Sequence, residues 1–221
     1  MDLARYQPWL LVLVLLVMGW FAAGVIWNIR RGNAILRWMQ AGLPRLGEKT
    51  TLRWLGTSVV ELTINRAKAP FRQVQVLLVM TPRDVPWLWL LASWRGRKDT
   101  LIVRGQLHSA PRLEYEVASP GSWTGRRAIA EARDRRWGEQ VDGQHLFLAP
   151  TPSLTVSRPG ALELLGSARK SFPGVWRLAV RRDTPQFEFH VPLPSPQGRE
   201  AGEYFEAIRR VALGASSAAS A

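Results

Sequence analysis

Four polar residues capable of acid–base chemistry recur at the same spacing in two segments of the chain. Glu114 and Glu116 are two residues apart in PRLEYEVASP, and Glu188 and His190 are two residues apart in PQFEFHVPLP. Side chains two apart on a strand point to the same face, so each pair would share a face. Paired carboxylates, or a carboxylate beside an imidazole, can transfer protons. An enzyme whose site assembles from these residues is therefore one hypothesis.

A simpler interpretation places the same four residues on the outer side of a sheet. The intervening positions are apolar or aromatic: Leu113, Tyr115 and Val117 in the first segment, and Phe187, Phe189 and Val191 in the second. Such alternation is typical of strands with one face on a core and the other in water. We therefore expect the four polar side chains to face water, and we predict that the chain is not an enzyme.

Other catalytic and metal-binding motifs do not fit the sequence. GLPRLGEKT, residues 42–50, comes nearest to a phosphate-binding loop, but Glu48 precedes Lys49 and a strand follows where a helix is needed. The three histidines have no metal-ligand spacing, and the chain has no cysteine for thiolate ligands or disulfides. No serine lies in a nucleophile-elbow pattern. We predict no metal and no cofactor.

The composition indicates a folded, basic protein. The 221 residues are 47% hydrophobic, include 11 tryptophans and carry a net charge of +13. This apolar content can supply a packed core, which excludes a chain disordered throughout. The charge favours anionic partners, whether lipid headgroups, nucleic acid or acidic proteins. Nucleic-acid binding remains an alternative, although an acidic open sheet face would repel the RNA backbone.

The first thirty residues predict a membrane anchor. Residues 8–27, PWLLVLVLLVMGWFAAGVIW, are uncharged and about as long as the roughly 20 residues that a spanning helix needs. Trp9 and Trp27 stand at the two ends, where aromatic side chains prefer the membrane interface. A cleaved signal peptide would have a shorter apolar run and a more basic start. We therefore predict a transmembrane helix over 8–27, after a short extracytoplasmic N-terminus over 1–7.

Positive charge on the C-terminal side of this helix predicts its orientation. Arg30, Arg31, Arg37 and Arg45 follow the apolar run, whereas Arg5 alone precedes it. Because such an excess stays on the cytoplasmic side, we expect a single-pass protein of the cell membrane with a cytoplasmic C-terminal domain.

The segment after the anchor, residues 28–47, predicts a basic amphipathic linker. Ile35, Trp38 and Met39 share one face at helical spacing, and Gly42 and Pro44 end the helix. A helix lying along anionic headgroups is the functional interpretation. A plain linker is the alternative.

The rest of the chain predicts an α+β domain of two ferredoxin-like halves, residues 48–140 and 141–213. Expected strands are 58–64, 71–80, 100–107, 112–118, either 145–149 or 153–157, 174–182 and 186–192, and expected helices are 86–94, 124–137, 160–171 and 199–213. A shift of 74 residues aligns LLASWR, 90–95, with LLGSAR, 164–169. A duplicated βαββα unit explains this order. Residues 214–221 predict a disordered tail.

The stretch PWLWLLASWRGRKD, residues 86–99, is the strongest candidate for a contact surface. Under the same shift, Leu90 and Leu91 match Leu164 and Leu165, so each leucine pair is expected to pack on its sheet. The tryptophans of this stretch have no counterparts: Trp87, Trp89 and Trp94 stand where the second copy has Ala161, Glu163 and Ala168. The extra apolar side chains could contact the other half, a protein partner or the membrane.

We therefore predict a non-enzymatic, membrane-anchored binding or scaffolding protein whose basic domain lies against the bilayer or a protein partner. A membrane-tethered nucleic-acid-binding protein and an enzyme with an unrecognised site are the alternatives. The expected membrane or partner contacts are Trp38, Trp87, Trp89, Trp94, Arg30, Arg31, Arg37, Arg95, Arg97 and Lys98.

Overall fold

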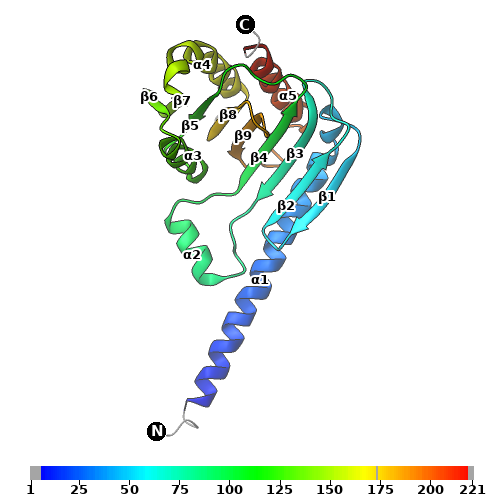
Figure 1. Cartoon of the computed structure of the whole chain (residues 1–221). Coiled ribbons are helices and arrows are strands. Elements are labelled where there is room, and N and C mark those ends of the chain that lie inside the picture. The colour runs from blue at the N-terminus through cyan, green and yellow to red at the C-terminus, as the bar shows by residue number, and fades with distance from the viewer. Residues whose placement is uncertain (1–5, 173, 219–221) are drawn as a thin grey trace.

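The structure, a computed structural model, describes residues 6–172 and 174–218. Its longest element is helix α1, Gln7–Gln40, which extends from a folded body of helices and strands (Figure 1). Pro8 lies in its first turn, where the fixed φ of proline and its missing N–H cost nothing. The helix runs unbroken to Gln40, so most of the predicted linker over 28–47 is its second half, followed by the 3₁₀ turn η2, Leu43–Arg45.

Nine strands form one sheet in the order β1-β2-β3-β4-β9-β8-β5-β7-β6. The strands are β1 Thr50–Leu55, β2 Val59–Ile64, β3 Phe71–Val79, β4 Thr100–Leu107, β5 Tyr115–Ala118, β6 Gly138–Asp142, β7 His145–Ala149, β8 Arg177–Val180 and β9 Phe187–Pro192. The helices between and after them are α2 Pro86–Trp94, α3 Trp123–Asp134, η3 Thr151–Ser153, α4 Leu154–Ser171 and α5 Ala201–Ala218. The sequence missed β6, and of its two alternatives for the next strand, 145–149 is a strand while 153–157 is helical.

The α+β class is confirmed, but two separate ferredoxin-like halves are not. Every neighbouring pair in the sheet is antiparallel, and the two segments interleave, because β4 pairs with β9 and β5 pairs with β8. Helix α4 makes the expected kind of crossover, since it joins β7 to β8 on opposite sides of β5, and α3 likewise joins β5 to β6 on opposite sides of β7. Helix α2 instead joins β3 to β4, which are direct antiparallel neighbours and need no crossover.

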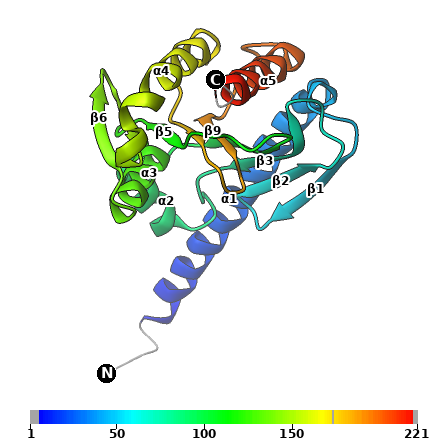
Figure 2. The ribbon, with the colours of Figure 1, turned by 45° about the horizontal axis from the view of Figure 1, so that its top comes forward.

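Helices cover the two faces of the sheet unequally. Helices α4 and α5 pack against each other on one face, and α3 lies on the other, over β5, β7 and β8 (Figure 2). The second half of α1 joins the α5 side, where Ile35, Leu36 and Met39 enter the main core. A smaller cluster forms beneath α3, where Ala128 and Ile129 meet the sheet.

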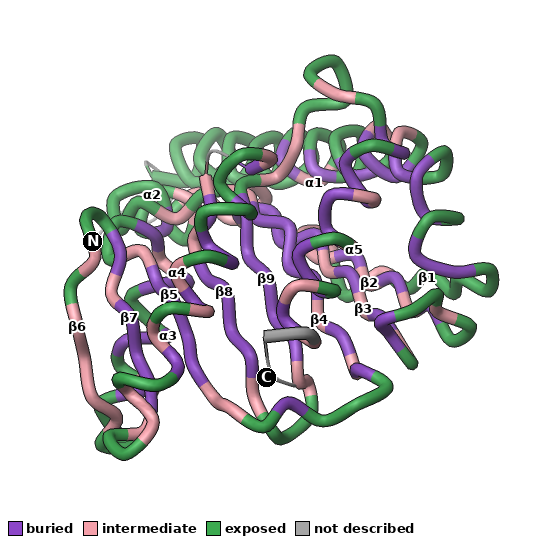
Figure 3. The backbone as a smooth tube through the Cα atoms, turned by 90° about the horizontal axis from the view of Figure 1, so that it is seen from above, coloured by how far each residue is buried: buried purple, intermediate pink, exposed green. Residues whose placement is uncertain are grey.

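The main core contains all but one of the apolar side chains that alternation predicted, the exception being Leu113, which is half-buried. Tyr115, Val117, Phe187, Phe189 and Val191 are all buried in it. Aromatic side chains join its layers: the rings of Phe172 and Phe189 are 5.1 Å apart, and those of Phe172 and Tyr204 are 5.0 Å apart. The central strands are therefore buried along most of their length, whereas the edge strand β1 is largely exposed and the edge strand β6 is mostly half-buried (Figure 3).

The prediction that the polar residues of β5 and β9 face water is wrong for three of the four. Glu116, Glu188 and His190 are 2%, 3% and 3% exposed, because α3 and arginine side chains cover this part of the face. Glu114 lies outside β5, half-buried, and accepts a hydrogen bond from the Arg182 backbone N–H at 3.0 Å.

The predicted disordered tail is partly helical. Helix α5 continues to Ala218, and Ala215 is fully buried in the main core. Residues 219–221 of that prediction lie outside the described residues.

Candidate membrane-facing surface

The first half of α1 is apolar and uncovered. From Trp9 to Phe21 its large side chains are exposed, and its most apolar 18-residue window has a mean hydropathy of 2.6, with 6% of that window buried. Among the described residues it is the one helix long and apolar enough to cross a membrane, by length and composition. An apolar surface of this extent is unusual on a protein that is surrounded by water.

Helix α2 presents a second uncovered apolar surface. Pro86 lies in its first turn, and Gly96, with φ +67°, lies just beyond its end in the left-handed conformation that commonly terminates helices. Ala92 is the one buried residue of α2. The exposed apolar side chains are Trp87, Leu88, Leu90, Leu91 and Trp94. Trp94 is 84% exposed, so α2 is not a core helix of the domain.

The remaining tryptophan of α2, Trp89, packs on α1. The ring of Trp89 lies 5.7 Å from that of Trp20, and the Trp20 indole donates a hydrogen bond of 2.9 Å to the Arg83 carbonyl. Gly24 permits this approach, since a Cβ there would lie 2.2 Å from the Arg83 carbonyl oxygen. Helix α2 consequently lies beside the middle of α1, on the same side of the body as its free half (Figure 1).

A polar cluster that we call the neck joins α1 to the connections on either side of α2. Its members are Asn28, Arg31, Thr81, Arg83 and Asp99. The Asp99 carboxylate accepts hydrogen bonds from the Thr81 N–H at 2.8 Å and from Arg83 at 3.1 Å, and pairs with Arg31 at 2.9 Å. Asn28, fully buried, donates to the Thr81 carbonyl at 3.2 Å and accepts from Arg83 at 3.2 Å.

The neck holds Asp99 in its charged form. Burial alone would raise the pKa of Asp99, but the hydrogen bonds from Thr81 and Arg83 and the charges of Arg83 and Arg31 outweigh it and lower the pKa. The neck is thus a structural joint: each charged group in it has a partner.

The predicted basic contact residues differ in whether their side chains are exposed or packed against a neighbour. Arg30, Arg37, Arg95 and Lys98 are exposed, whereas Arg97 lies 4.7 Å over the ring of Trp123. Arg31 remains partly exposed although it pairs with Asp99. Two of the exposed cations, Arg30 and Arg37, therefore lie on the second half of α1, and the other two, Arg95 and Lys98, follow α2.

Trp38 faces the domain instead of a membrane. Its indole donates to the Arg199 carbonyl at 2.8 Å, and its ring packs edge-on against Tyr204 at 5.3 Å. Helical spacing grouped Trp38 with Ile35 and Met39 correctly, but this face of α1 covers the core.

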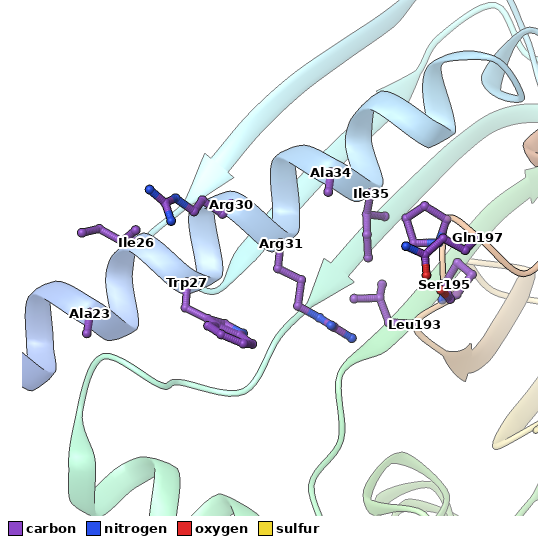
Figure 4. Close-up of a pocket in the computed structure, with 12 residues that line it drawn as sticks. Ala23, Ile26, Trp27, Arg30, Arg31, Ala34, Ile35, Leu193, Ser195 and Gln197 are labelled. Atoms are coloured by element: carbon purple, nitrogen blue, oxygen red, sulfur yellow. The ribbon is translucent and has the colours of Figure 1, made fainter.

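A groove of about 850 Å³ lies where the apolar half of α1 ends. Trp27 and Arg31 project from one side of the helix, and Leu193 and Ser195, after β9, lie opposite Ile35 (Figure 4). Most of the lining is apolar, and the two cations in it are Arg30 and Arg31. Such a groove can hold a hydrocarbon chain beside an anionic group.

The sequence did not predict the groove wall at residues 193–197 or the neck. Asn28, a polar residue at the end of an apolar run, and Asp99, an acid at the end of a basic run, were the available signals. Their partners lie tens of residues away in the chain, so local patterns could not pair them. No protein-family model matches the chain, and a search of curated proteins returns no relative for it.

Proposed function

We propose that this protein is a membrane-anchored binding module held on the bilayer at two points. Helix α1 spans the membrane, and α2 enters the interface beside it. The basic domain then lies directly on the headgroups of the cytoplasmic leaflet, where it binds anionic lipid and can present its outer surface to a partner.

The observation that carries this proposal is the position of α2's uncovered apolar surface. Trp87, Leu90 and Trp94 are exposed on the short helix whose Trp89 packs against Trp20, in the apolar half of α1. Anything that surrounds Trp20 with lipid therefore brings lipid to α2 as well. A nine-residue helix is too short to span, but it suits an interfacial segment rich in tryptophan.

The neck supports a membrane boundary at about Gly24, one helical turn beyond Trp20. Arg83 and Asp84 pack against Gly24, and charged side chains are costly in the hydrocarbon. The last turn of the predicted span, up to Trp27, would then lie at headgroup level. Arg30 and Arg31 follow at once, in the groove, where they can meet lipid phosphates.

Depth measurements with single cysteines test the two-point attachment. The chain has no cysteine, so one introduced residue carries a spin label at a unique site. Leu90→Cys reports on α2, Leu16→Cys on the anchor, and Val156→Cys on an exposed apolar position of α4. In liposomes, relaxation by oxygen, which dissolves in lipid, is compared with relaxation by a water-soluble nickel complex.

We expect the label on Leu90→Cys to behave like that on Leu16→Cys, with more relaxation by oxygen than by nickel. The label on Val156→Cys should show the reverse. A Leu90→Cys label that matches Val156→Cys would place α2 in water and overturn the proposal.

Lipid selectivity tests the groove. Arg30 is exposed, and its replacement in Arg30→Gln should weaken binding of a phosphatidylglycerol titrant by about fivefold, because a cation near the surface contributes about 1 kcal/mol. Arg210→Gln removes the same charge from an exposed position on α5 and is the matched control. Equal losses in both variants would indicate attraction by net charge alone.

Orientation is tested in intact cells with a membrane-impermeant maleimide. The Val156→Cys variant should react only after lysis if the domain is cytoplasmic. Reaction in unbroken cells would reverse the orientation inferred from Arg30, Arg31, Arg37 and Arg45.

A further inference from the structure

A row of charged side chains is buried on the α3 face of the sheet, away from the surface described above. Arg177 and His190 are register partners on β8 and β9, and Arg104 and Glu188 are partners on β4 and β9. Arg177, Glu188 and His190 are each less than 5% exposed. So many ionisable groups beneath a helix are uncommon, because each must find a partner to offset its lost hydration.

The carboxylates in this row are paired with arginines. Arg177 Nε donates to Glu116 at 2.9 Å, and its Nη2 donates to Glu131 at 2.9 Å. Arg104 Nε donates to Glu188 at 2.9 Å. Burial alone would raise the pKa of Glu188, but the hydrogen bond from His190 and the charges of Arg177 and Arg104 hold it well below its usual range.

His190 has one nitrogen engaged and one free. Its Nε2 lies 3.0 Å from the Glu188 carboxylate, and burial lowers the pKa of the ring. In the neutral ring Nε2 carries the proton that the carboxylate accepts, so Nδ1 is left with a lone pair. Among the described residues Nδ1 has no hydrogen-bond partner, although the side chain is only 4% exposed. A buried acceptor without a partner calls for a donor, which a molecule bound in an adjoining pocket can supply.

His190 also lines a pocket of about 270 Å³ between α3 and the sheet. Its walls carry five arginines, namely Arg104, Arg127, Arg135, Arg177 and Arg181, against the two carboxylates Glu131 and Glu188. Glu116 does not line the pocket, but it pairs with Arg177 and Arg181 and so offsets one more positive charge. The pocket keeps an excess of two positive charges.

Part of this excess faces no carboxylate. Arg135 has no carboxylate partner among the described residues, and its guanidinium lies 5.6 Å over the Trp137 ring. Arg127 uses its Nε for Glu131, at 2.9 Å, which leaves its Nη groups as donors. Guanidinium groups of this kind suit the oxygens of a tetrahedral anion.

We propose that this pocket binds inorganic phosphate. Monohydrogen phosphate offers acceptor oxygens to Arg104, Arg127 and Arg135, and its own P–OH donates to His190 Nδ1. A volume of about 270 Å³ holds this anion with a few waters. Sulfate has the same shape and charge but no proton to donate, so it leaves Nδ1 unpaired. This site is independent of the membrane-facing surface and gives the domain a soluble ligand.

Calorimetric titration of the full-length protein in detergent, in a buffer free of other multivalent anions, tests the assignment. Phosphate should bind at least about tenfold more tightly than sulfate, the effect of one hydrogen bond to a charged ligand. His190→Phe should remove that preference. Arg135→Gln, which breaks no ion pair with a carboxylate, should weaken phosphate and sulfate by a similar factor of about ten.

Arg210→Gln, on the opposite side of the sheet, is the control and should leave phosphate affinity unchanged. Three results overturn the proposal: no phosphate binding at ten millimolar, equal affinity for sulfate, or equal losses in Arg135→Gln and Arg210→Gln. If His190→Phe fails to fold, the phosphate preference of the unaltered protein and the Arg135→Gln result still decide.

Discussion

Helices α2 and α4 carry similar sequences in opposite environments. LLASWR in α2 aligns with LLGSAR in α4, yet Leu90 and Leu91 are 64% and 38% exposed, whereas Leu164 and Leu165 are 5% and 2% exposed. The expectation that both leucine pairs pack on a sheet is therefore right for α4 and wrong for α2.

The difference follows from how each helix is connected. Helix α4 joins two strands that flank β5, so its path crosses the sheet and its apolar side is buried there. Helix α2 joins β3 to β4, which are already neighbours, so its connection is free to leave the sheet and reach α1. Connectivity thus decides what an apolar helix face meets when the local sequence does not.

Truncation of matched leucines should give the largest contrast between the two helices. Leu165→Ala should lower the free energy of unfolding by about 2–5 kcal/mol, because it leaves a cavity in the core. Leu91→Ala should lower it by less than about 1 kcal/mol. Urea unfolding in mild detergent, followed by circular dichroism, measures both. Similar losses would mean that α2 also has a core contact.

Two glycines of α1 test whether the contact with α1 holds α2 in place. Gly24→Leu places a side chain against the backbone of Arg83 and Asp84 and should cost up to about 3 kcal/mol. Gly19→Leu is the control, since nothing lies within 4 Å of its Cβ position. We expect tryptic cleavage after Arg95 to accelerate in Gly24→Leu alone. Equal cleavage in both variants would show that the α1–α2 contact does not restrain α2.

Acid should loosen the neck on which α2 depends. The pKa of Asp99 is lower in the folded state than in the unfolded chain, so its contribution is present above about pH 4 and is lost as the pH falls through the folded value. Asp99→Asn should cost about 1.5 kcal/mol at pH 7. The difference from wild type should shrink between pH 4 and pH 2. A constant difference across that range would assign the effect to packing.

The smallest contrast concerns the residue that follows the aligned pair of leucines in each helix. Gly166, exposed on α4, aligns with Ala92, buried on α2. Gly166→Ala should stabilise the protein by about 0.5–1 kcal/mol, because glycine is a poor helix former and its Cβ position is open. Ala92→Gly should destabilise α2 by a similar amount. Thermal unfolding curves resolve both shifts.

Periodicity predicted the local structure well. The alternation through Tyr115 and Phe187 identified core strands, and the helix expected over 86–94 is α2. The features that periodicity missed depend on contacts between residues far apart in the sequence. Glu188 looked like a water-facing residue because nothing nearby indicates that Arg104 and α3 would cover it. The neck and the groove likewise join residues that only the sheet order brings together.

The unbroken course of α1 has a mechanical consequence. A 34-residue helix is a rod about 51 Å long, and its second half is packed into the main core. The body therefore cannot swivel on a flexible tether, and any tilt of the rod turns the whole sheet with it. Bilayer thickness, which sets the tilt of such a rod, would then set the angle at which the domain meets its surroundings.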